Sequence, residues 1–137
     1  MTGVQAYRRQ SAPAWTRIDA ILFLYRRADE NLDRAESLLA AGDAAAAGPL
    51  LIETQTIVTA FASGLDMAEA SSVQLLKLYE YVGHQLAQAT VAALREARKT
   101  MKTLAAGFED VQDRARQMER TGELPPFSES SAITATA

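Results

Sequence analysis

The segments "KLYEYVGHQLAQA" (77–89) and "FLYRRADENLDRA" (23–35) share one pattern: Leu-Tyr, six residues, Leu, two residues, Ala. In each segment the tyrosine precedes the second leucine by two helical turns, so the two side chains fall on one helix face. Tyr25 and Tyr79 therefore lie on apolar faces. The doubled pattern is typical of two equivalent helices facing a common core, in which each buried tyrosine needs a partner for its hydroxyl group.

Apolar residues at steps of three and four continue outside both segments and predict four amphipathic helices. The first helix is expected to begin near Pro13–Thr16, the second to span about 46–63, and the last to run to Met118. The apolar positions are Ile18, Ile21, Tyr25, Ala28, Leu32, Ala35 and Leu39; Leu51, Thr54, Val58, Phe61 and Leu65; Leu75, Tyr79, Val82, Leu86 and Ala89; and Leu94, Ala97, Met101, Leu104, Phe108, Val111, Ala115 and Met118.

Capping residues mark the ends of these helices. Gly42 is expected to end the first helix and Asp43 to cap the second. Ser71 or Ser72 is expected to cap the third helix. Thr90 is the one capping candidate before the last helix, so a sharp turn is expected there, with a single continuous helix as the less compact alternative.

The pattern predicts an all-α fold, an antiparallel up-down four-helix bundle, over residues 14–120. Residues 1–13 have no helical apolar face and are expected to form a flexible N-terminal segment. Residues 121–137 contain two prolines and many small polar residues, so a disordered tail is expected there.

Composition excludes several classes of protein. The 137 residues are 48% hydrophobic and 23% charged, with a formal net charge of −3, which gives no broad attraction to nucleic acid or an anionic membrane. The chain has no cysteine, which excludes disulfides and fits a cytoplasmic location. It also has no signal peptide and no apolar run of about 18 residues, so membrane insertion is not expected.

Residues that could support catalysis are sparse, and we expect neither an enzyme nor a cofactor or metal site. His84 is the single histidine, and with Glu80 it forms an ordinary helix-surface pair. No glycine-rich phosphate loop is present. Basic residues cluster at 95–102, but acidic residues follow on the same helix, so a solvated face is favoured over a nucleic-acid site. The cluster comprises Arg95, Arg98, Lys99 and Lys102.

The second predicted helix differs from the others because Glu53 is the only charged residue between Asp43 and Asp66. A helix without a charged face is either surrounded by its own fold or covered by a partner. Ile52 points away from the apolar arc of this helix, and Phe23 points roughly opposite the core face of the first helix. These features favour a groove that binds an amphipathic helix of another protein.

Three motifs resemble the flagellar secretion chaperones that bind flagellin, the FliS-like family. The first is "AYRRQSAPAWTRIDAILFLYRRA" (6–28), with its early tyrosine and Leu-Tyr pair. The second is "TQTIVTAFASGLD" (54–66), and the third is "LKLYEYVGHQLAQA" (76–89). The matching residues are Tyr7, Leu24, Tyr25, Gln55, Ile57, Val58, Leu65, Asp66, Leu78, Tyr79, Glu80, Tyr81, Leu86 and Ala89.

The resemblance covers roughly residues 6–112 and has clear departures. Arg26-Arg27 replaces Asp/Asn-Gly, Thr90 replaces Asn, and Phe108 replaces the family's tryptophan.

The resemblance implies a cytosolic, non-enzymatic chaperone. It would hold the C-terminal segment of flagellin, prevent premature polymerisation and deliver flagellin to the flagellar type III export gate. It also implies that the segment around Tyr7 covers a groove that flagellin uses. The resemblance and the exposed apolar positions together give the expected partner-binding residues. These are Tyr7, Phe23, Ile52, Gln55, Ile57 and Tyr81. A homodimer, and a helical adaptor or oligomerisation module without a flagellin partner, remain open alternatives.

Overall fold

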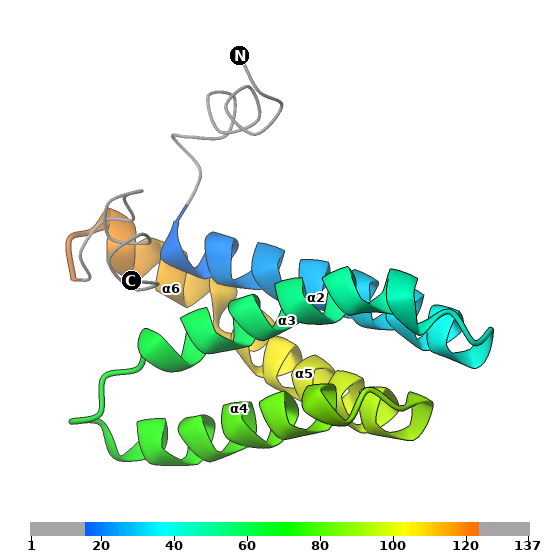
Figure 1. Ribbon diagram of the computed structural model, residues 1–137. Helices are drawn as coiled ribbons and strands as arrows, with labels where there is room; N and C mark the ends of the chain where they lie inside the picture. Colours follow the sequence, from blue (N-terminus) through cyan, green and yellow to red (C-terminus); the bar gives the residue numbers. More distant parts are fainter. Residues whose placement is uncertain (1–15, 124–137) are drawn as a thin grey trace.

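A computed structural model describes residues 16–123, all of whose regular structure is helical. The elements are α2 (Arg17–Ala40), α3 (Ala44–Ser63), α4 (Ala70–Gln88), α5 (Val91–Asp110) and α6 (Gln112–Arg120). The four long helices run alternately up and down as two hairpins, α2–α3 and α4–α5 (Figure 1). Each packs on its neighbours in the chain, and α2 packs on α5 to close the bundle. The predicted fold class is confirmed, while the predicted segment 1–13 and residues 124–137 of the predicted tail lie outside the described residues.

Most helix ends follow the predicted capping chemistry. Asp43 accepts a hydrogen bond from the backbone of Ala46 at 3.1 Å, and Thr90 accepts one from Ala93 at 3.1 Å. Gly42 has a φ of +82°, the left-handed conformation that glycine adopts easily after a helix. Ala89 also adopts the left-handed conformation, with a φ of 52°, so the turn before α5 is sharp and the continuous-helix alternative is excluded.

Two predicted helix boundaries are wrong. α4 begins at Ala70 with Glu69 at its N-cap, ahead of the expected serines. The last predicted helix is divided at Val111. The N–H of Val111 donates to the carbonyl of Phe108 at 3.2 Å. This hydrogen bond spans three residues instead of four and tightens the final turn of α5. Val111 is consequently exposed instead of buried. A one-residue break leaves the spacing of apolar residues intact, which is why the pattern alone misses it.

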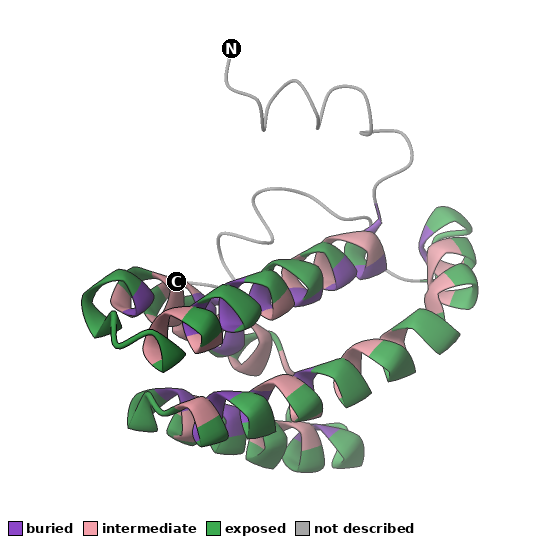
Figure 2. Cartoon of the chain, turned by 90° about the vertical axis from the view of Figure 1, so that its right-hand side faces the viewer, coloured by how far each residue is buried: buried purple, intermediate pink, exposed green. Residues whose placement is uncertain are grey.

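The core occupies the space between the two hairpins, where the predicted apolar faces meet. Figure 2 shows buried residues on the inward sides of the helices and exposed residues on the outer sides. The largest fully buried side chains include Leu32, Leu86, Leu94 and Met101, one or two from each of three helices. α3 adds Ile57 and Val58 to the same cluster.

The two tyrosines of the doubled pattern meet in this core. Tyr25 Oη and Tyr79 Oη lie 2.7 Å apart in a buried hydrogen bond between α2 and α4. The ring of Tyr25 stacks on Phe61, with ring centroids 4.5 Å apart, and Phe61 also contacts Tyr79. Each tyrosine therefore supplies the hydroxyl partner that the other requires.

Ion pairs join α2 to α5 along one edge of the bundle. Arg98 binds Asp29 at 2.7 Å and Asp33 at 3.0 Å, and Arg95 binds Glu36 at 2.7 Å. The two arginines of the basic cluster are thus neutralised within the fold. The alternative of a nucleic-acid-binding face therefore loses the charge of two of the four basic residues on which it depended.

α6 lies beside the beginning of α2, and a polar network that we call the α2–α6 clasp joins them (Figure 1). Asp19 accepts hydrogen bonds from Gln112 at 3.0 Å and from Arg116 at 2.7 Å. The buried carboxylate of Glu119 accepts the backbone N–H of Arg17 at 3.1 Å, so α6 supplies a cap to the first turn of α2. Burial raises the pKa of Asp19, but the hydrogen bonds from Arg116, Gln112 and Thr16 outweigh it and hold this pKa below its usual value.

We expect Arg116→Ala to release α6 from α2. Removing a charged donor from the Asp19 carboxylate should weaken the clasp by about 1 kcal/mol or more, so backbone amides in α6 should exchange hydrogen faster than in the wild type. Arg114→Ala, which removes an exposed arginine of the same helix, is the matched control and should leave exchange unchanged. Equal exchange rates in α6 for the Arg116→Ala variant and the wild type would contradict the assigned clasp.

The clasp should also respond to acid. Because the folded pKa of Asp19 is depressed, its stabilising contribution is present above the unfolded value of about 3.8 and is lost as pH falls through the folded value. Protection of α6 should therefore persist at pH 5 and fall below pH 3.8.

Candidate functional site

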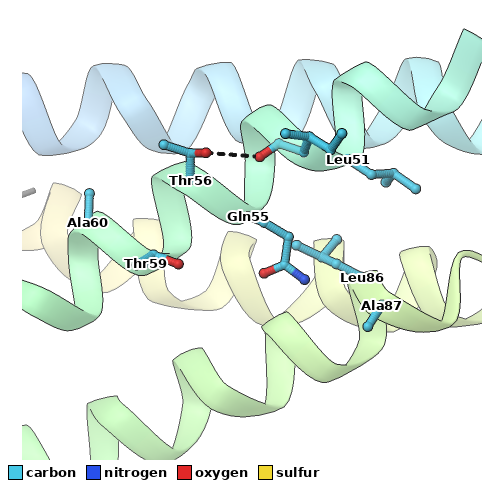
Figure 3. A pocket seen from close by; sticks show the side chains of 8 residues that line it. Leu51, Gln55, Thr56, Thr59, Ala60, Leu86 and Ala87 are labelled. Carbon is cyan, nitrogen blue, oxygen red and sulfur yellow. Dashed lines mark hydrogen bonds between the residues drawn. The ribbon is translucent and has the colours of Figure 1, made fainter.

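A groove runs between α3 and α4, and we call it the α3–α4 groove. Its volume is about 450 Å³, and none of the side chains that line it is ionisable. It is lined by Leu51, Ile52, Gln55, Thr56, Thr59 and Ala60 of α3 and by Leu86 and Ala87 of α4 (Figure 3). Its walls are therefore apolar or uncharged, as expected for a surface that receives an apolar helix face.

The single charged residue of α3 is directed away from this groove. Glu53 forms an ion pair with Arg27 of α2 and accepts a hydrogen bond from Asn31 at 3.3 Å. Hydrogen bonds from Arg27 and Asn31 lower the pKa of Glu53. The exposed side of α3 is consequently a stripe without charge, at steps of four and three residues. It comprises Ala45, Pro49, Ile52, Thr56, Thr59 and Ser63.

The floor of the groove contains one polar bridge between the hairpins. Gln55 extends from α3 toward α4 (Figure 3), and its Nε2 donates to the carbonyl oxygen of Gly83 at 2.8 Å. A Cβ atom at Gly83 would lie 3.3 Å from Gln55 Oε1, so glycine leaves room for the amide. Beside it, the hydroxyl of Thr56 donates to the carbonyl of Ile52 at 3.1 Å, marked by the dashed line in Figure 3.

A second, smaller groove of about 160 Å³ lies between α2 and α5. Charged residues of both signs line it: Arg26, Asp29, Lys102 and Glu109. Closing this groove with an apolar helix would remove those charges from water at a large cost in free energy. The α3–α4 groove is therefore the better candidate for an apolar partner.

The structure places the predicted site residues in different environments. Ile52 is 70% exposed and lines the α3–α4 groove together with Gln55. Ile57 is only 6% exposed and packs in the core, so a partner cannot reach its side chain, and it is not kept as a contact residue. Phe23 and Tyr81 are exposed on α2 and α4, outside the groove lining, whereas Tyr7 lies outside the described residues.

Several groove residues were not predicted. Thr56 and Thr59 follow Ile52 at steps of four and three, so the spacing that singles out Ile52 could have found them. Ala87 gives no comparable signal, because its place in the groove depends on how α4 packs against α3.

Within residues 16–123, no group of three or more histidine, cysteine or acidic side chains is placed to hold a metal ion. None of the described helices is long and apolar enough to cross a membrane. His84 is exposed on α4.

Comparison with known proteins gives one informative match. The family model of the flagellar protein FliS matches residues 1–115, which includes all three motifs, the four long helices and the first residues of α6. No curated protein and no solved structure gives a significant match. Because the family model covers most of the chain, this protein belongs to the FliS family of flagellar proteins, which are export chaperones and not enzymes.

Proposed function

We propose that this protein is a cytoplasmic export chaperone that binds the C-terminal segment of flagellin and hands it to the flagellar type III export gate. Family membership supports a chaperone role in flagellar export. The observation that carries the more specific proposal is the α3–α4 groove, an uncharged channel bordered by the strongly exposed Ile52. Such a groove matches the apolar face of an amphipathic helix.

The terminal segments of flagellin are amphipathic and assemble through coiled-coil contacts, as the family resemblance implies. Covering the apolar face of such a segment removes the surface through which flagellin subunits associate. It also keeps the segment from folding against other subunits before export.

A groove of about 450 Å³ accommodates only a few side chains. Ordering a disordered segment costs conformational entropy, which a short contact cannot offset. The partner is therefore expected to extend beyond the groove, and exposed apolar residues on α2 and α4, such as Phe23 and Tyr81, are candidates for the additional contacts.

Ile52→Asp is the direct test of this site. Because the side chain is 70% exposed, the variant should fold normally, yet it places a charge on the uncharged groove. We expect binding of a flagellin C-terminal peptide to weaken by about 1 kcal/mol or more in titration calorimetry. Val73→Asp changes an exposed valine of α4 outside the groove and is the control.

The competing functions predict different outcomes. If the folded Ile52→Asp variant binds the peptide with wild-type affinity, the peptide does not bind in the α3–α4 groove. A helical oligomerisation module would instead show no peptide binding, and sedimentation would detect a self-association that Ile52→Asp weakens. Sedimentation of the free wild-type chain therefore accompanies the titration.

A further inference from the structure

The α3–α4 groove contains a polar acceptor whose orientation is fixed by the fold. Gln55 Nε2 must face Gly83 because the carbonyl oxygen there accepts a hydrogen bond at 2.8 Å, and this orientation determines the position of Oε1. Within residues 16–123 Oε1 receives no hydrogen bond, and it is accessible to solvent. Water can therefore satisfy this oxygen while the groove is empty.

Binding of an apolar helix would remove that water. A buried acceptor left without a donor costs free energy, so a fully apolar partner face would be penalised at Gln55. A partner with a hydrogen-bond donor at this point avoids the penalty.

The donor must also be uncharged. No ionisable side chain lines the groove, so a lysine or arginine head buried there would lack an opposite charge. Asparagine, glutamine, serine and threonine supply neutral donors. In coiled coils, one polar residue in an apolar face fixes the register of the partner helices, and the same physical effect applies here.

We propose that the α3–α4 groove recognises an amphipathic helix whose apolar face carries one uncharged hydrogen-bond donor, and that Gln55 Oε1 accepts from it and sets the register of binding. The identification of this helix with a flagellin C-terminal segment rests on the proposed function. Gly83 contributes to this recognition because a larger residue at position 83 would crowd Gln55 Oε1.

The test is a set of double-mutant cycles measured by titration calorimetry. The chain is prepared as wild type, Gln55→Met and Gln55→Glu, with Gln74→Met, an exposed glutamine of α4 outside the groove, as the matched control. The probes are the flagellin C-terminal peptide and a set of its variants. In each variant one Asn, Gln, Ser or Thr is replaced by Ala. Circular dichroism and thermal melting establish that each variant is folded.

Gln55→Met should weaken binding of the unmodified peptide about fivefold or more, and Gln74→Met should not. At one peptide position, replacement by Ala should weaken binding to the wild type but not binding to Gln55→Met, since both changes remove the same hydrogen bond. A peptide with lysine at that position should bind the Gln55→Glu variant more tightly than it binds the wild-type chain. A merely structural role of Gln55 would not produce this effect.

Two results would overturn the inference in distinguishable ways. Tight peptide binding by the wild type without any coupled position overturns the role of Gln55 and leaves the proposed function standing. No peptide binding by the folded wild-type chain overturns the proposed function, and this inference with it.

Discussion

Leu86→Ala is expected to lower the free energy of unfolding by about 2–5 kcal/mol, because the substitution removes a buried side chain and leaves a cavity. Leu86 is 2% exposed and belongs to the main core cluster. Leu78 of the same helix is 39% exposed and provides the control with identical chemistry. Chemical denaturation of Leu86→Ala, Leu78→Ala and the wild type, followed by circular dichroism, measures both losses.

Leu78→Ala should cost clearly less than Leu86→Ala, since less of its side chain leaves water on folding. Similar losses for the two variants would mean that α4 is rotated from its assigned position. A loss of less than about 0.5 kcal/mol in the free energy of unfolding of Leu86→Ala would mean that this leucine does not lie in the core.

The buried pair of Tyr25 and Tyr79 should show a strong energetic coupling. Either single change to phenylalanine leaves the other hydroxyl buried without its partner and should cost about 1–3 kcal/mol of stability. The double variant replaces both hydroxyls and should cost less than the sum of the two single changes. Denaturation of the four proteins gives the coupling, and simple additivity would mean that the hydroxyls do not depend on each other.

The same pair predicts a loss of stability in alkali. Burial raises the pKa of Tyr25 and of Tyr79 above the ordinary value of 10.0, and for Tyr79 the hydrogen bond with Tyr25 opposes this in part. Their stabilising contribution is fully present below the unfolded pKa and is lost as pH rises above it, because the unfolded chain then releases protons that the folded chain retains. Stability should fall above about pH 10, and the double phenylalanine variant should reduce this fall.

The fold could be predicted largely from the spacing of apolar residues. Steps of three and four residues located both tyrosines on inward faces, and the structure confirms this for Tyr25 and Tyr79. The contact between their hydroxyls could not be predicted, because periodicity fixes the face of one helix and not its depth against another. The division at Val111 was missed because it leaves the spacing of apolar residues intact. The contacts of α6 with α2, from Arg116 to Asp19 and from Glu119 to Arg17, join residues far apart in the chain and leave no local pattern.

The candidate site was predictable only on α3. Ile52 was identified because it lies off the apolar arc, and Glu53 because it is the only charge in the helix. The direction in which Glu53 turns depends on Arg27 of α2, which no local pattern reveals. Ile57 was selected from the family resemblance, but a motif does not separate residues that contact a partner from residues that hold the core.

The links and polar contacts between helices are distributed unevenly around the bundle. The hairpins α2–α3 and α4–α5 are closed by the short links 41–43 and 89–90, whereas residues 64–69 join one hairpin to the other. Arg95 and Arg98 hold the hairpins together by ion pairs along the α2–α5 edge. At the opposite edge, within residues 16–123, the single side-chain hydrogen bond between α3 and α4 is that of Gln55 to Gly83. Because the α2–α5 edge carries these ion pairs and the α3–α4 edge this one hydrogen bond, we expect thermal opening of the bundle to begin between α3 and α4.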